Sequence, residues 1–177
     1  TFDKVKNTAH QKWNEKLGRI QVEGKDSINK VKFYTGLYHA LLGRGLASDT
    51  NGQYIQHNGK IGQIALNSKG KPKYNHYNTD GIWGGFWNLG QLWALAYPDY
   101  QSEYIQSNLD FAKETGWLHD GVAAGAHSNG VQTNCFGLMI APTYNCGIRD
   151  FDVEEAYQTA YKNETGYANR PFGSGKY

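Results

Sequence analysis

Cysteine is scarce in this sequence, whose 177 residues include two, Cys135 and Cys146. So few cysteines mean that no disulfide framework supports the fold, and a chain of this size does not need one. Both lie in one predicted helix, where a rise of about 1.5 Å per residue places them roughly 16 Å apart, too far for a disulfide. Their spacing also differs from that of a zinc site. The sequence therefore predicts two unpaired thiols.

Neither sign of charge dominates, and long apolar runs are absent. The formal charge of +2 comes from 18 basic and 16 acidic residues scattered along the chain, without a long run of Lys or Arg. Nucleic acid is therefore not an expected partner. No segment approaches the roughly 18 apolar residues of a membrane span, and no basic head before an apolar stretch marks an export signal. The sequence predicts no membrane partner.

An initiator Met is also missing, because the sequence begins at Thr1. It ends on residues 169–177, whose Pro, Gly and Ser are typical of an irregular loop. We therefore expect both ends to be internal to a longer protein. The length and the 39% hydrophobic content suit one domain with one core, and no linker marks a boundary inside it.

Aromatic residues and glycine are abundant instead, with 13 Tyr, 5 Trp, 7 Phe and 22 Gly. Flat rings suit sugar binding, because their faces pack on sugar C–H groups while a Tyr hydroxyl or a Trp N–H reaches a polar partner. The alternative for each ring is a place in the core, where aromatic side chains contribute most of their energy. Composition alone leaves both interpretations open.

Apolar residues recur at helical spacing through most of the chain, as in Phe2, Val5, Ala9, Trp13 and Leu17. Helical spacing or an all-round apolar character predicts six helices, over residues 2–17, 28–41, 80–97, 100–115, 132–145 and 153–161. The expected helix caps are Asp26 or Ser27 for the second helix, Asp99 for the fourth and Asp152 for the last. An Asn-Gly turn signal between two apolar-containing runs, at Asn58-Gly59, predicts a hairpin within residues 48–74. The fold class is therefore mainly α, with helices in antiparallel pairs and one β-hairpin.

Two motifs carry a resemblance to a known family. The first is Phe33-Tyr34-Thr35-Gly36-Leu37-Tyr38 and the second is Asp49-Thr50-Asn51-Gly52-Gln53-Tyr54. In order and spacing they resemble the Phe-Tyr-Thr-x-Leu-Tyr and Asp-x-x-Gly-x-Tyr signatures of family 92 glycoside hydrolases. Other matching elements extend the similarity over residues 1–162.

The resemblance implies a calcium-dependent exo-α-mannosidase that inverts the anomeric carbon, built from a β-sandwich and an (α/α)₆ barrel. This chain would be a partial barrel, with a hairpin and loop insertion at 47–75 and an irregular tail at 163–177. In the family the base and most metal contacts lie further along the sequence, so calcium would belong to the full-length parent. The implied partners are a mannose-containing glycan and the missing remainder of the parent chain, in the periplasm or outside the cell.

The sequence departs from the family where a sugar-binding carboxylate is expected after a Trp, because Gly84-Gly85 follows Trp83. Trp83 is the part of that motif which remains, either as a sugar platform or as core. Asp80, three residues earlier, is a candidate replacement for the lost carboxylate. The alternative is that Asp80 caps the helix that follows.

The family's acid is also replaced, because ungapped counting from Gly147 places His127 at its position. An imidazole can donate a proton near neutral pH, so His127 is the candidate catalytic residue. His119 and Asp120 share its loop and are candidates for substrate binding. The alternatives are an ordinary loop histidine and a solvent-facing pair.

Three hypotheses on function follow from the resemblance. In the first, the parent is a family 92-like glycosidase that acts on α-mannosides with altered site residues, and this chain alone is inactive. Alternatively, the parent is a carbohydrate-binding relative without catalysis. In the third, the isolated segment has no function and leaves large apolar patches exposed.

Overall fold

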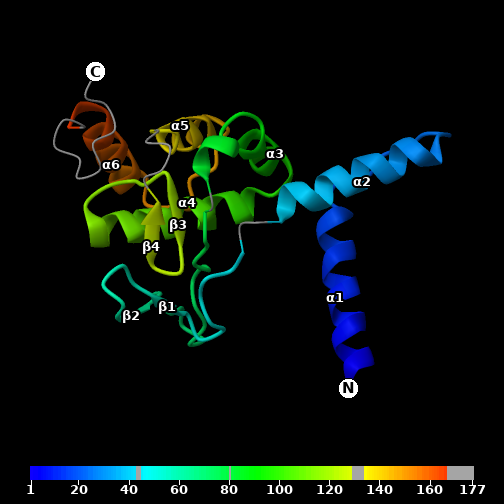
Figure 1. The fold of residues 1–177 in the computed structure, drawn as a ribbon, viewed down its shortest axis with the longest axis horizontal. Helices are drawn as coiled ribbons and strands as arrows, with labels where there is room; N and C mark the ends of the chain where they lie inside the picture. Colours follow the sequence, from blue (N-terminus) through cyan, green and yellow to red (C-terminus); the bar gives the residue numbers. More distant parts are fainter. Residues whose placement is uncertain (43–44, 80, 129–133, 167–177) are drawn as a thin grey trace. The chain divides into compact units, whose positions relative to one another are not determined.

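The structure, a computed structural model, describes residues 1–42, 45–79, 81–128 and 134–166 (Figure 1). The chain divides into two compact units, residues 1–42 and residues 43–177. The candidate Asp80 lies outside the described residues. No described helix has both the length and the apolarity needed to cross a membrane.

The first unit is a pair of helices, α1 (Phe2–Leu17) and α2 (Ser27–Leu41). Asp26 caps α2, as predicted, because its carboxylate accepts hydrogen bonds from the backbone N–H groups of Ile28 and Asn29. The two helices touch through Trp13 and Tyr38, whose ring centroids are 4.6 Å apart. No residue of α1 is buried, so much of the predicted apolar face remains open.

Four helices and two hairpins make up the described part of the second unit. Its elements are β1 (Gln53–Ile55), β2 (Ile61–Gln63), η1 (Ile82–Gly84), α3 (Leu89–Ala96), α4 (Pro98–Thr115), β3 (Gly121–Ala123), β4 (Ala126–Ser128), α5 (Gly137–Asn145) and α6 (Val153–Thr165). Helix α4 packs against α3 and α6, and α5 also packs against both (Figure 1). The core gathers around α4, where Tyr104, Ile105 and Leu109 are buried beside Trp93 and Phe136. Such burial of large apolar side chains stabilises the unit.

A line of carboxylates on α4 holds the segment that contains the first hairpin. Glu103, Asp110 and Glu114 recur every seven and four residues and therefore share one helix face. Each accepts a tyrosine hydroxyl hydrogen bond: from Tyr77 to Glu103 at 2.8 Å, from Tyr74 to Asp110 at 2.7 Å and from Tyr54 to Glu114 at 3.0 Å. Bonds of this charge-assisted kind are stronger than neutral ones.

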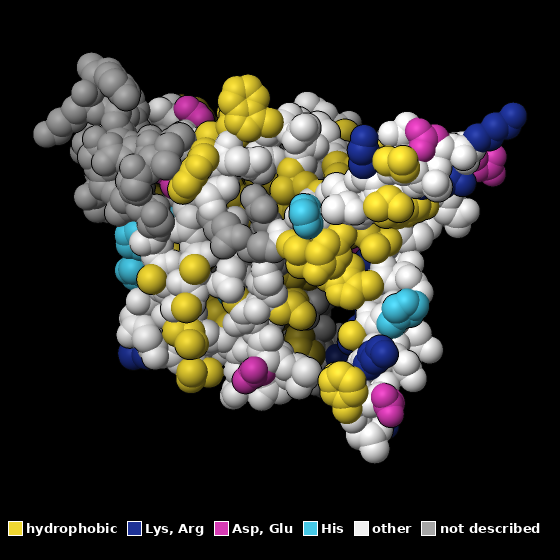
Figure 2. All heavy atoms as spheres, turned by 45° about the vertical axis from the view of Figure 1, so that its right-hand side comes forward, with side chains coloured by type: hydrophobic (Ala, Val, Ile, Leu, Met, Phe, Trp, Pro, Cys, Tyr) yellow, Lys and Arg dark blue, Asp and Glu magenta, His cyan; other side chains and the backbone are white. Residues whose placement is uncertain are grey.

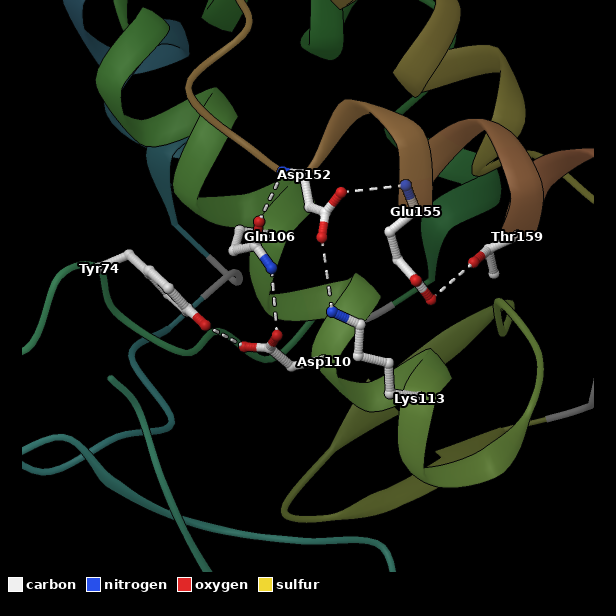
Figure 3. A network of polar contacts seen from close by, with 7 residues as sticks. All are labelled: Tyr74, Gln106, Asp110, Lys113, Asp152, Glu155 and Thr159. Atoms are coloured by element: carbon white, nitrogen blue, oxygen red, sulfur yellow. Dashed lines mark hydrogen bonds and ion pairs between the residues drawn. The ribbon is translucent and has the colours of Figure 1, made fainter. Parts of the chain in front are cut away.

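The same face of α4 connects to α6 through a polar network (Figure 3). Gln106 donates to Asp110 and accepts a hydrogen bond from the backbone N–H of Asp152 at 2.9 Å. The Asp152 carboxylate in turn caps α6 by accepting from the N–H of Glu155, as predicted, and lies 3.8 Å from the Lys113 ammonium. Helix α4 therefore joins the hairpin segment to the C-terminal helix.

The mainly α fold and the hairpin within 48–74 are confirmed, while several boundaries differ from prediction. The helix predicted over 80–97 divides into η1 and α3, and Trp87 (73% exposed) and Leu95 (83% exposed) face outward. Helix α4 begins at Pro98, so Asp99 lies in its first turn and does not cap it. The stretch predicted as a loop over 116–130 contains a second hairpin, β3–β4. Neither Cys135 nor Cys146 forms a disulfide.

Candidate functional site

A cleft of about 440 Å³ opens beside the second hairpin. Its lining residues are Gly81, Trp83, Gly121, Val122, Ala123, Ala126 and His127. Trp83 comes from η1 and His127 from β4, so two side chains far apart in the sequence share one hollow. Apart from these two, the wall is made of small or apolar residues.

Backbone hydrogen bonds bring η1 and the second hairpin together. The N–H of Thr79 donates to the carbonyl of Val122, and the N–H of Ile82 donates to the carbonyl of Asp120, both at 2.8 Å. The Thr79 hydroxyl also accepts a bond from the N–H of Val122 at 2.7 Å. The Trp83 ring folds back over Gly81, where a Cβ atom would lie 2.5 Å from the indole. A glycine at position 81 is therefore needed for this placement of the ring.

His127 lies in a cluster of three imidazoles. Its ring centroid is 4.2 Å from that of His119 and 4.9 Å from that of His57, with interplanar angles of 30° and 34°. His57 lies just beyond β1, so the cluster joins the two hairpins. Phe111 of α4 meets both outer histidines edge to face, at 5.7 Å from His57 and 5.4 Å from His119.

The structure places His119 and Asp120 behind the cleft. They are 5% and 3% exposed, and neither is among the lining residues. The alternative of a solvent-facing pair therefore does not hold. His119 contacts His127, while the backbone carbonyl of Asp120 anchors η1. His119 and Asp120 therefore influence the cleft indirectly, His119 through His127 and Asp120 through η1.

The electrostatics of the cleft favour a neutral imidazole. Burial lowers the pKa of His127 below its ordinary value, and the neighbouring His57 lowers it further. A neutral imidazole accepts a proton at one nitrogen and donates a hydrogen bond from the other. The described lining residues include no carboxylate, so His127 is the group of this wall that can exchange protons.

The described residues do not fit a calcium ion. They contain no group of three or more His, Cys, Asp or Glu side chains that could hold a metal. Calcium also prefers oxygen ligands, which the imidazoles around His127 do not supply. No chemical step at this cleft is therefore derived through calcium.

Three residues of this region escape prediction from the sequence: His57, Glu114 and Thr115. Glu114 accepts hydrogen bonds from Tyr54 and from the backbone N–H of His57, and Thr115 bonds His119. No local pattern relates position 57 to position 127. An Asn-Gly turn predicts the first hairpin, but the second hairpin and its contact with the first arise from tertiary packing.

A model of the glycosyl hydrolase family 92 catalytic domain matches residues 1–176. The chain belongs to glycoside hydrolase family 92. This confirms the resemblance carried by the two sequence motifs. A search of curated proteins found no significant match.

Solved structures of family 92 enzymes share the fold. A family 92 α-mannosidase from Bacteroides thetaiotaomicron is 20% identical, with a TM-score of 0.81 over 90% of this chain and 21% of its own. A structure described as that enzyme in complex with mannoimidazole gives 18% identity and a TM-score of 0.84, over 97% of this chain and 22% of that chain. A family 92 inverting mannosidase from Bacteroides thetaiotaomicron VPI-5482 is 23% identical, with a TM-score of 0.74 over 89% of this chain and 20% of that chain.

These likenesses confirm the expected fold, a segment of a family 92 helical barrel domain. The chain spans about a fifth of the length of the solved structures it matches. Activity, substrate and partners of a whole family 92 protein are therefore matters for proposal.

Proposed function

We propose that this chain is part of the catalytic barrel of a family 92 glycosidase that hydrolyses α-mannosides with altered site residues. The observation that carries the proposal is the cleft in which Trp83 and His127 meet, within a chain that belongs to this family. The indole offers an apolar face to the C–H side of a sugar ring. His127 offers hydrogen bonds to the sugar hydroxyls from the neighbouring wall.

The expected inverting mechanism needs an acid and a base about 6.5–9.5 Å apart, with a water molecule on the base side. His127 stands where the family's acid is expected, but its lowered pKa favours the neutral ring over the proton-donating imidazolium. We assign it hydrogen bonding to the substrate and proton acceptance. The carboxylic acid that serves as general acid then comes from residues outside the described part of this chain. The other member of the acid–base pair comes from there as well.

The first experiment assays the full-length protein on α-mannosides with and without a calcium chelator. Hydrolysis that chelation abolishes is the expected result, because calcium would hold sugar hydroxyls through oxygen ligands elsewhere in the protein. Full activity in chelator would contradict the proposal.

A pair of tryptophan variants tests the cleft itself. We expect Trp83→Ala to weaken binding of methyl α-mannoside by about fivefold, since stacking on an aromatic ring contributes on the order of 1 kcal/mol. Trp87→Ala is the matched control, because Trp87 is highly exposed and does not line the cleft. Equal effects of both substitutions, measured by calorimetry, would argue against a sugar platform at Trp83.

The alternative is a carbohydrate-binding relative without catalysis. It is favoured by one observation: the described lining of the cleft contains no carboxylate. Isothermal titration of mannose oligosaccharides distinguishes the two functions. Binding without turnover supports the alternative, whereas turnover supports the enzyme.

A second hollow is proposed to bind the remainder of the parent domain. A groove of about 390 Å³ between α5 and α6 is lined mainly by apolar and aromatic residues, among them Ile140, Tyr144, Phe151 and Tyr157. An apolar helix face of this kind is normally covered in a finished domain. Its relatives have about five times the length of chain to cover it. Calcium ligands and a periplasmic or extracellular location belong to that longer protein.

A further inference from the structure

The two histidines that contact His127 are each bonded by one of two consecutive residues at the end of α4. The Glu114 carboxylate accepts the backbone N–H of His57 at 2.8 Å through one oxygen and the Tyr54 hydroxyl at 3.0 Å through the other. Next to it, the Thr115 hydroxyl oxygen lies 2.7 Å from Nε2 of His119. His57 and His119 are the two imidazoles that contact His127.

The hydroxyl of Thr115 has two backbone carbonyls within reach besides the ring of His119. A hydroxyl has one proton, and the Oγ1 atom of Thr115 lies 3.1 Å from the backbone carbonyls of Phe111 and Trp117. When that proton points to a carbonyl, the oxygen accepts the Nε2–H of His119. In either direction the bond constrains the ring orientation of His119 beside His127.

Helix geometry explains why one turn of α4 suffices. Phe111, Glu114 and Thr115 are spaced by three and four residues, so they share one face of the helix. Phe111 meets both outer imidazoles edge to face. Glu114 bonds the backbone N–H of His57, and Thr115 bonds the ring of His119. The tip of the second hairpin presses on the first, because a Cβ atom at Gly125 would lie 2.7 Å from the Gln56 carbonyl oxygen.

We propose that Glu114 and Thr115 are positioning residues for His127, which fix its imidazole at the wall of the cleft by holding His57 and His119 against it. This inference rests on the proposed function for the use of His127, but the positioning is testable without any substrate. Neither residue lines the cleft, so both act through the two outer histidines.

The test follows the ring signals of His127 by NMR during a pH titration of the whole chain with labelled histidine. Thr115→Val keeps the side-chain shape and removes the hydroxyl, so His119 loses this hydrogen bond and the pKa of His127 rises toward its ordinary value. Glu114→Gln leaves one carbonyl oxygen for two donors, and we expect a smaller rise. The expected shift for Thr115→Val is about half a pH unit, because the His119 ring that helps to bury His127 is no longer held in place.

Two matched variants separate positioning from general loosening. Thr165→Val is the first, because the Thr165 hydroxyl bonds the carbonyl four residues earlier at the end of α6, as the Thr115 hydroxyl bonds that of Phe111. Among the described residues, no hydrogen bond joins the Thr165 hydroxyl to an imidazole. It should leave the His127 titration unchanged, and Thr115→Ser should restore it. Should Thr115→Val fail to fold, Glu114→Gln and His57→Phe carry the same test.

The outcomes distinguish this inference from the proposed function. An unchanged His127 titration in Thr115→Val and Glu114→Gln overturns the positioning role, whatever the activity. A shifted titration supports it, even if His127→Gln leaves mannoside binding by the full-length protein intact. Unchanged mannoside binding in His127→Gln would contradict the proposed role of His127 in substrate binding. It would leave the positioning role of Glu114 and Thr115 unaffected.

Discussion

At the scale of single residues, backbone strain concentrates in the turn of the second hairpin. Ala124 has a φ of 50°, beside Gly125 at 73°, in the two-residue turn that joins β3 to β4. Left-handed backbone costs a residue with a Cβ atom about 1 kcal/mol, and Asn tolerates it better than Ala.

We therefore expect Ala124→Asn to raise the free energy of unfolding by about 0.5–1 kcal/mol. Urea denaturation measures the change. Ala123→Asn, in the extended strand next to the turn, is the control and should give no gain. A loss of stability at position 124 would show that the turn needs the methyl group.

His76 makes the stability of the chain depend on pH. It is 3% exposed and stacks on Tyr54 with ring centroids 4.2 Å apart, and burial lowers its pKa from 6.5 to about 4. The unfolded chain then binds a proton more readily than the folded one. The contribution of His76 to the free energy of unfolding is fully present above pH 6.5. It is lost as the pH decreases toward 4, and the loss is about 3 kcal/mol.

His76→Phe keeps a ring on Tyr54 and removes the titration. We expect the variant to lose less stability than the parent chain between pH 6.5 and 4. Denaturation midpoints across that range test this expectation, with His10→Phe as the control, because His10 lies on an exposed surface of α1. Parallel pH profiles of the His76 variant and the parent chain would contradict it.

At the scale of elements, the carboxylate line on α4 makes a specific prediction. Burial raises the pKa of Asp110, and the hydrogen bond from Tyr74 opposes that rise. Tyr74→Phe removes the donor and should cost about 2 kcal/mol at neutral pH, the usual value for a hydrogen bond to a charged group. The cost should shrink at acid pH, where the carboxyl group is already neutral.

Hydrogen exchange gives the local readout for Tyr74→Phe. Amides of β1 and β2 should exchange faster, since α4 then holds the hairpin segment less firmly. Tyr161→Phe is the matched control on the exposed face of α6. Unaltered exchange in the hairpin would mean that Glu103 and Glu114 suffice to hold it.

The helices were largely predictable, whereas the site was predictable in part. Steps of three and four residues predicted α1, α2 and α4, and Asp26 and Asp152 do cap their helices. The pattern fails at 80–97, because an all-round apolar segment has no preferred face and Gly84 and Gly85 weaken the helix. Family motifs brought Trp83 and His127 to notice, but the contact of His57 with His127 depends on packing between segments 70 residues apart.

At the scale of the whole chain, apolar surface remains uncovered. Figure 2 shows hydrophobic side chains exposed in several places on the face in view. Tyr157, which lines the groove between α5 and α6, is 60% exposed. Surfaces of this kind favour association in water.

We expect the isolated chain to self-associate as its concentration rises, and Tyr157→Lys to reduce that association. Sedimentation velocity measures both. Gln158→Lys adds the same charge one residue along α6, outside the groove, and should have less effect. A chain that stays monomeric at all concentrations would contradict the idea that the groove needs a cover.

The contact between Gly125 and the Gln56 carbonyl has a practical meaning for anyone who alters this protein. A label or peptide inserted at Gly125 would separate the hairpins and displace the histidines together, whereas Gly70, with open space around it, can accept one. For the same reason, a transplant of the histidine cluster into a related barrel has to carry both hairpins and the last turn of α4 as a single block.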